Sequence, residues 1–304
     1  MRRPGTSQCH WSGTSRTCNP EYGPTLKRVT RGFPRIPAGL SGLLRDIAMD
    51  FPTVLKDNLV GIYLWGSLTY NAFDKRCSDV DSIVVTRKDL TDAEFVVLGR
   101  WFRRAARRNA WVQRLDMRFV IDREFLDKTS KCCGFYSGRL TRHGSDANPI
   151  IWMNIGRCGI TLWGKEAKRI APAVSDRRLN DALLLELDYL SEDLTKNAGG
   201  RSVRAFRHNA YAVLTACRIL YTAHNRVIVP KDMAYEWAIA SIPEEWRPVV
   251  AAARVNRIRN HGTATRRLER NAAGFVCFVR EQIQRTLAGR AMHEPSTQTV
   301  SRCP

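Results

Sequence analysis

Apolar residues follow two different patterns along the chain, and the change between them divides it into two halves. The first half contains short, continuous apolar runs bounded by glycine or polar residues, which is typical of buried strands. These runs predict strands over residues 59–65, 81–86 and 115–121, and a further strand within 148–155. Helices are predicted over 40–59, from apolar residues at helical spacing, and up to 109 from a Thr91-x-x-Glu94 capping box.

The second half has helical periodicity throughout. Leucines recur on one side of the segment 180–197, and similar patterns predict helices over 206–223, 232–242, 244–259 and 269–287. The predicted organisation is therefore an α/β domain over 39–172 followed by an all-helical domain over 173–288. Residues 1–38 are expected to form a flexible basic extension and residues 289–304 a tail, because neither segment has apolar periodicity.

Composition and charge narrow the class of protein. With 304 residues and 44% hydrophobic residues the chain is predicted to be globular, which excludes disorder as its main state. Its longest uncharged run, 58–73, is shorter than the roughly 20 apolar residues of a membrane span, so no membrane partner is expected. The net charge of +20 suggests a polyanionic partner, although seven basic residues and one acid lie in the extension.

The nine cysteines include no C-x-x-C pair, and the histidines lack metal-ligand spacing. We expect reduced thiols in a cytoplasmic protein, because the extension also lacks the apolar stretch of a secretory signal.

The residues most indicative of chemistry follow the first two strands. The first strand ends in Gly66-Ser67, and Asp79-x-Asp81 comes at the head of the second. Residues i and i+2 of a strand face the same side, so Asp79 and Asp81 are expected to present adjacent carboxylates. Two such groups repel each other unless a cation lies between them, and hard oxygen ligands suit Mg²⁺. Glycine permits close backbone approach, and Ser67 offers a hydroxyl and an N–H to phosphates.

Asp116 is a candidate third carboxylate, because it lies at the start of the next strand. It could complete a metal site for phosphoryl transfer and take the proton from an attacking hydroxyl. The alternative is an exposed strand residue that pairs with Arg118. An Asp-x-Asp sequence alone is common in turns, so the argument depends on the Gly-Ser motif upstream.

The order apolar strand, Gly-Ser, Asp-x-Asp, strand resembles the nucleotidyltransferase superfamily with its polymerase-beta-like fold. A second similarity is independent of the first. The stretch 160–170, Ile-Thr-Leu-Trp-Gly-Lys-Glu-Ala-Lys-Arg-Ile, resembles a segment of the aminoglycoside adenylyltransferases that modify streptomycin and spectinomycin. So do 213–221, Val-Leu-Thr-Ala-Cys-Arg-Ile-Leu-Tyr, and 230–237, Pro-Lys-x-x-Ala-x-x-Trp.

The resemblance implies ATP and Mg²⁺ in a cleft between the α/β nucleotidyltransferase domain and the all-α domain. It implies that Asp79 and Asp81 hold the metal, and Asp116 falls where the family has a glutamate as general base. We therefore assign the metal site to Asp79, Asp81 and Asp116, with Asp116 also catalytic. ATP binding is assigned to Gly66, Ser67, Ser78, Arg218 and Lys231.

The expected function is AMP transfer from ATP to a hydroxyl of an aminoglycoside, such as streptomycin or spectinomycin, which would give antibiotic resistance. Polycationic acceptors need carboxylates, and Glu186, Asp188, Glu192 and Asp193 offer them on one helix, although a solvated helix face is the alternative. A different function class is a nucleotidyltransferase or basic binding protein that acts on nucleic acid or protein. The arginines of 103–108 would then contact phosphates rather than form a solvated face.

Overall fold

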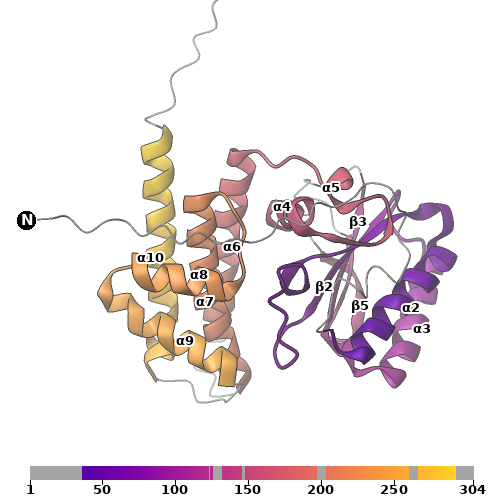
Figure 1. Ribbon diagram of the computed structural model, residues 1–304, viewed down its shortest axis with the longest axis horizontal. Coiled ribbons are helices and arrows are strands. Elements are labelled where there is room, and N and C mark those ends of the chain that lie inside the picture. The colour runs from indigo at the N-terminus through magenta and orange to yellow at the C-terminus, as the bar shows by residue number, and fades with distance from the viewer. Residues whose placement is uncertain are drawn as a thin grey trace, which may run out of the picture.

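The computed structural model describes residues 36–122, 124–125, 132–145, 148–196, 203–259 and 266–291. Nearly all of the predicted basic extension and most of the predicted tail lie outside these ranges. Within them, the expected α/β half followed by an all-helical half is confirmed (Figure 1).

The first half is built on a six-stranded mixed sheet with the order β5-β4-β3-β2-β1-β6. β2 and β3 are parallel, and the other neighbouring pairs are antiparallel. The three strongest strand predictions are confirmed within a residue or so, whereas β4, β5 and β6 were not predicted. The strands are β1 (Leu59–Leu64), β2 (Val80–Thr86), β3 (Leu115–Ile121), β4 (Cys132–Tyr136), β5 (Arg139–Ser145) and β6 (Ile160–Gly164).

The two faces of the sheet are covered by different helices. One face packs under α2 (Ala38–Leu55) and α3 (Asp92–Arg108), where Phe51 contacts the rings of Trp101, Phe102 and Phe119. Both halves of the predicted capping box are present at the start of α3. The other face packs against α4 (Pro149–Cys158) and α5 (Ala167–Ile170).

The strand predicted within 148–155 is wrong, because this segment forms helix α4. Asn148 caps the helix by accepting a hydrogen bond from the Ile150 N–H, and Pro149 occupies the first turn, where its missing N–H costs nothing. Ile151 and Trp152 then face the sheet. The apolar run was misassigned because a buried helix and a buried strand look alike over so few residues.

The second half is formed by five helices: α6 (Asp176–Lys196), α7 (Val203–Asn225), α8 (Lys231–Ser241), α9 (Arg247–Arg259) and α10 (Arg266–Ala291). All five correspond to predicted helices, except that 244–246 form a separate 3-10 turn before α9. They share one apolar core, in which α7 is central and packs against α6, α8, α9 and α10. No helix in the described ranges is long and apolar enough to cross a membrane.

Helix α4 connects the two halves. Its residues Ile151, Trp152 and Ile155 are buried against the sheet, whereas Ile150 and Met153 pack against the core of the helical half. The same short helix therefore belongs to both cores.

Replacing Phe51 by alanine is expected to reduce the free energy of unfolding by about 3–5 kcal/mol, because the ring is fully buried among three aromatic rings. The matched control Met49→Ala lies on the same helix but is 61% exposed, so its effect should stay within about 0.5 kcal/mol. Denaturant unfolding measures both, and equal losses would show that α2 does not anchor this core.

Candidate active site

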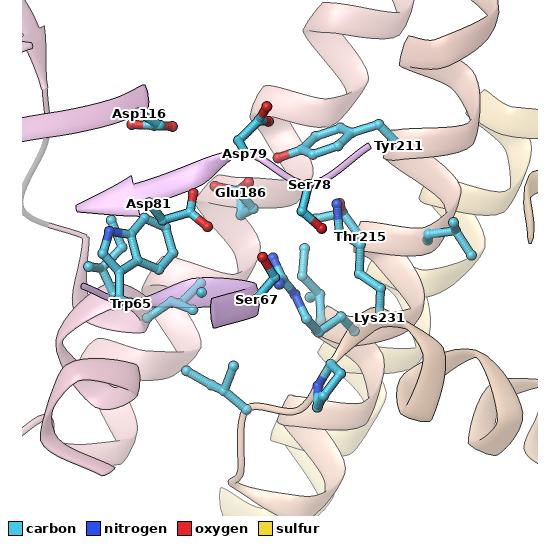
Figure 2. Close-up of a pocket in the computed structure, with 18 of the residues that line it drawn as sticks. Trp65, Ser67, Ser78, Asp79, Asp81, Asp116, Glu186, Tyr211, Thr215 and Lys231 are labelled. Atoms are coloured by element: carbon cyan, nitrogen blue, oxygen red, sulfur yellow. The ribbon is translucent and has the colours of Figure 1, made fainter. Parts of the chain in front are cut away.

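A cleft of about 1290 Å³ lies between the sheet and the helical half. All eight residues assigned from the sequence line it, although they come from segments far apart in the chain. They are Gly66, Ser67, Ser78, Asp79, Asp81, Asp116, Arg218 and Lys231. Figure 2 shows the three aspartates on the strand side of this pocket, and Tyr211 and Lys231 on the helical side.

Asp81 and Asp116 are direct neighbours on the parallel strands β2 and β3. Side chains alternate along a strand, so Asp81 shares its face with Ile83 and Asp116 shares its face with Val120. Both apolar residues are buried in the cluster under α4. The two carboxylates therefore continue the buried rows into the cleft.

Burial and the neighbouring carboxylates make ionisation of Asp81 costly. Burial, followed by the charges of Asp116 and Asp79, raises the pKa of Asp81 to about 7, although Arg218 and Arg118 act in the opposite direction. Asp79 precedes β2 and is exposed at the edge of the cleft, and partial loss of its water raises its pKa as well. The alternative pairing of Asp116 with Arg118 also occurs, with 3.7 Å between Oδ1 and Nε.

The donor set fits a magnesium ion in charge and in chemistry. Excess negative charge on hard oxygens is what this cation compensates, and Mg²⁺ usually takes only one or two carboxylates together with water and substrate phosphates. Among the residues that the structure describes, no three acidic, histidine or cysteine side chains are grouped closely enough to hold a metal by themselves.

The Gly66-Ser67 turn has a role that its sequence only partly indicated. Gly66 has a φ of +72°, and a Cβ atom there would collide with the Asp81 carboxylate. The close approach that requires glycine is thus to Asp81. The Gly66 N–H donates a hydrogen bond to Asn154 Oδ1 at 3.2 Å, which leaves Ser67 as the residue of this turn that offers polar groups to the cleft.

Ser78 is almost fully buried at the wall of the cleft. Its Oγ accepts a hydrogen bond from the Asp74 N–H at 3.0 Å. The Arg114 guanidinium donates to the carbonyl oxygens of Lys75 and Ser78. Ser78 thus helps to hold the segment that leads into Asp79, and sequence reasoning missed Arg114, which also lines the cleft.

The helical half contributes cations to the opposite wall. Arg218 lies on α7, Lys231 is the first residue of α8, and Arg257 extends from α9. Burial and the charges of Arg218 and Arg257 lower the pKa of Lys231 well below its ordinary value, and Asp81 and Asp79 oppose this shift. Lys231 Nζ lies 4.0 Å from the centre of the Tyr211 ring.

Acidic residues from α6 line another part of the cleft. Glu186, Asp188 and Glu192 reach it, whereas Asp193 pairs with His208 Nδ1 at 2.7 Å. Asp188 forms an ion pair with Arg280. The cleft therefore has a cationic side and an anionic side.

Comparisons with known proteins show which families this chain resembles. Residues 169–282 match the family described as aminoglycoside adenylyltransferase, C-terminal domain. A spectinomycin 9-adenylyltransferase of Campylobacter jejuni is 23% identical over 250 residues, which cover 77% of this chain and 92% of that protein. One of Staphylococcus aureus strain Mu50 is 25% identical over 234 residues, covering 71% and 85%.

The chain resembles the aminoglycoside adenylyltransferases, in its helical half by the family match and over most of its length at 23–25% identity. These matches confirm the resemblance to aminoglycoside adenylyltransferases that the three sequence motifs indicate. The fold of this adenylyltransferase-like protein is also that of spectinomycin adenyltransferase AAD(9) from Enterococcus faecialis, solved with ATP and spectinomycin. The two superpose with a TM-score of 0.61 at 17% identity, covering 79% of this chain and 98% of the other.

Asp81→Asn is expected to stabilise the protein in the absence of divalent cations at pH 8. Because its pKa is raised in the fold, the native state holds the Asp81 proton to higher pH than the unfolded chain. The protonated Asp81 carboxyl therefore stabilises the fold at low pH, and this contribution to the free energy of unfolding is lost as pH rises from about 4 to about 7. At pH 8 the asparagine variant should be more stable than the wild type by on the order of 1–3 kcal/mol.

Thermal unfolding at pH 5 and pH 8 measures this difference, with Asp46→Asn on α2, outside the cleft lining, as the control. If the Asp81 variant melts at or below the wild-type temperature at pH 8, the carboxylate is not under electrostatic strain.

Proposed function

We propose that the protein transfers AMP from ATP to a hydroxyl group of an aminoglycoside, and that spectinomycin is the first acceptor to test. The observation that carries this proposal is the division of charge within one cleft. Three aspartates face Arg218 and Lys231, and the carboxylates of α6 lie in the same cavity. Such a cleft can hold a triphosphate and a polycation together.

The reaction requires few groups from the chain. Asp116 accepts the proton of the acceptor hydroxyl, whose oxygen forms a bond to the α-phosphorus of ATP while the bond to the bridging oxygen breaks and pyrophosphate leaves. Arg218 and Lys231 bind the phosphates and the charge that develops on the leaving pyrophosphate. Ser67 donates its hydroxyl or N–H to a phosphate oxygen.

Magnesium held by Asp79 and Asp81 would neutralise phosphate charge and help to orient the triphosphate. The remaining contribution of the chain is positioning, because the cleft wall fixes the nucleotide relative to Asp116. Burial and the charges of Arg218 and Arg257 lower the pKa of Lys231, and a bound triphosphate would favour its charged form.

The acceptor is expected to bind at the carboxylates of α6 that line the cleft. Glu186 and Glu192 on α6 are suited to ammonium groups, which spectinomycin and streptomycin both carry as cations. The AAD(9) structure contains spectinomycin together with ATP, which makes spectinomycin the first choice.

The test is incubation with labelled ATP and Mg²⁺ over a panel of aminoglycosides, RNA and protein. The wild-type protein should label spectinomycin or another aminoglycoside, and Asp79→Ala should reduce the rate by at least about 100-fold with the fold intact. Asp46→Ala, which removes a carboxylate of α2 outside the cleft, should retain full activity. Near-normal turnover by Asp79→Ala would remove this carboxylate from the site.

Nucleic-acid binding is a second candidate function, supported by the outer face of α3. Five arginines of this helix are exposed, and within the described part of the chain none of them forms an ion pair or hydrogen bond through its side chain. They recur at intervals of three or four residues and thus form a row along the helix. They are Arg100, Arg103, Arg104, Arg107 and Arg108.

If this row contacts phosphates, affinity for a fluorescent tRNA should fall with salt, and Arg103→Glu/Arg107→Glu should reduce the slope of log K against log salt by about 1–2. The matched control is Arg177→Glu/Arg178→Glu, which reverses two exposed arginines at the start of α6. Equal effects of the two double variants would reduce the interaction to net charge and exclude a specific surface on α3.

A further inference from the structure

The Gly66-Ser67 turn is held by a buried side chain from a helix that carries none of the assigned site residues. Asn154 lies on α4 and is only 3% exposed. Its Oδ1 accepts a hydrogen bond from the Gly66 N–H at 3.2 Å. Its Nδ2 donates to the Tyr70 hydroxyl. Both polar ends of the amide are thus used by the segment that follows β1.

Thr69 completes this network. Its hydroxyl donates to the Gly66 carbonyl oxygen at 2.8 Å and lies 3.5 Å from Asn154 Oδ1. The N–H and the carbonyl of Gly66 are therefore both fixed. The Gly66 carbonyl and the Ser67 N–H belong to the same planar peptide group, so fixing the carbonyl also fixes the direction of the Ser67 N–H.

The same turn also determines where Asp81 can lie. The Trp65 N–H donates to the Asp81 carbonyl oxygen at 3.1 Å, which extends the pairing of β1 with β2 by one step. The Asp81 carboxylate then rests against Gly66, at the place where a Cβ atom would be. A shift of the turn would move both Ser67 and the surface against which Asp81 packs.

We infer that Asn154 is a positioning residue for nucleotide binding, which acts by locking the Gly66-Ser67 turn between β1 and helix α4. Tyr70 supports this role from the wall of the cleft, where it holds the donor end of the Asn154 amide. The inference rests on the proposed use of MgATP, and it adds a residue that touches neither ATP nor the acceptor.

The network is favourable only while the amide is present. A buried N–H without a partner is costly, so removing Asn154 Oδ1 should allow the turn to move toward solvent and recover a hydrogen bond there. The consequence for function is a less organised phosphate site, which appears as weaker nucleotide binding.

The experiment compares two variants with a control on the same helix. Asn154→Leu keeps the approximate volume and removes both hydrogen bonds, whereas Tyr70→Phe removes only the acceptor of Nδ2. Trp152→Phe is the control, because this fully buried residue of α4 packs on the sheet and against Phe125, and its indole N–H donates no hydrogen bond to the Gly66-Ser67 turn. Calorimetry gives the Kd of MgATP, kinetics gives KM for each substrate, and thermal unfolding reports stability.

Asn154→Leu should raise the Kd of MgATP about tenfold, and Tyr70→Phe by a smaller factor of about two to five. The double variant should bind no more weakly than Asn154→Leu, since both changes act on the same turn. KM for the acceptor should change less than KM for ATP. Trp152→Phe should lower the melting temperature without changing the Kd.

An unchanged Kd for Asn154→Leu, with a melting temperature lowered as in Trp152→Phe, would show that Asn154 is only structural and would overturn the inference. An additive double variant would do the same, because the two side chains would then act separately. If the wild-type protein itself fails to bind MgATP, the proposed function fails instead, and the two failures are therefore distinguishable.

Discussion

The repulsion between the carboxylates of Asp81 and Asp116 is the interaction on which the arrangement of the cleft depends. Parallel pairing of β2 and β3 fixes these side chains opposite each other, and the buried rows behind them leave no freedom to separate. The fold keeps this charge near Arg118 and Arg218, which offset it only in part. The negative charge that remains is what the proposed magnesium ion would compensate.

Neither half of the molecule could form this site alone. The first half contributes Asp79, Asp81 and Asp116. The helical half contributes Arg218, Lys231 and Arg257 from α7, α8 and α9, together with the carboxylates of α6. Burial, followed by the charges of Arg218 and Arg257, lowers the pKa of Lys231, so these cations also repel one another. A bound nucleotide with its metal would relieve both repulsions at once. Part of the chain's large positive charge therefore lies in the cleft. The exposed arginines of α3 are a separate group of positive charges outside it.

The sequence predicted the central strands and helices well, because long apolar periodicities and a capping box leave few alternatives. The eight residues assigned from motif order and family resemblance all line one cleft, and their roles in it stay a prediction. The sequence-based prediction was wrong at α4, because an apolar run this short shows neither helical nor strand periodicity. The Asn154 network was missed for a related reason. A single asparagine in an apolar segment gives no signal of its partners, which lie more than 80 positions earlier in the chain.

Because α4 packs in both cores, residues cannot be inserted into this helix without disturbing the packing of both halves. Each residue added to an α-helix rotates everything beyond it by about 100°. An insertion between Ile150 and Asn154 would therefore turn Asn154 away from Gly66, and would also turn the face that packs on the helical half relative to the face that packs on the sheet. Loops elsewhere can lengthen at little cost, whereas the residue count of this one helix sets the alignment of the two halves and of the phosphate turn together.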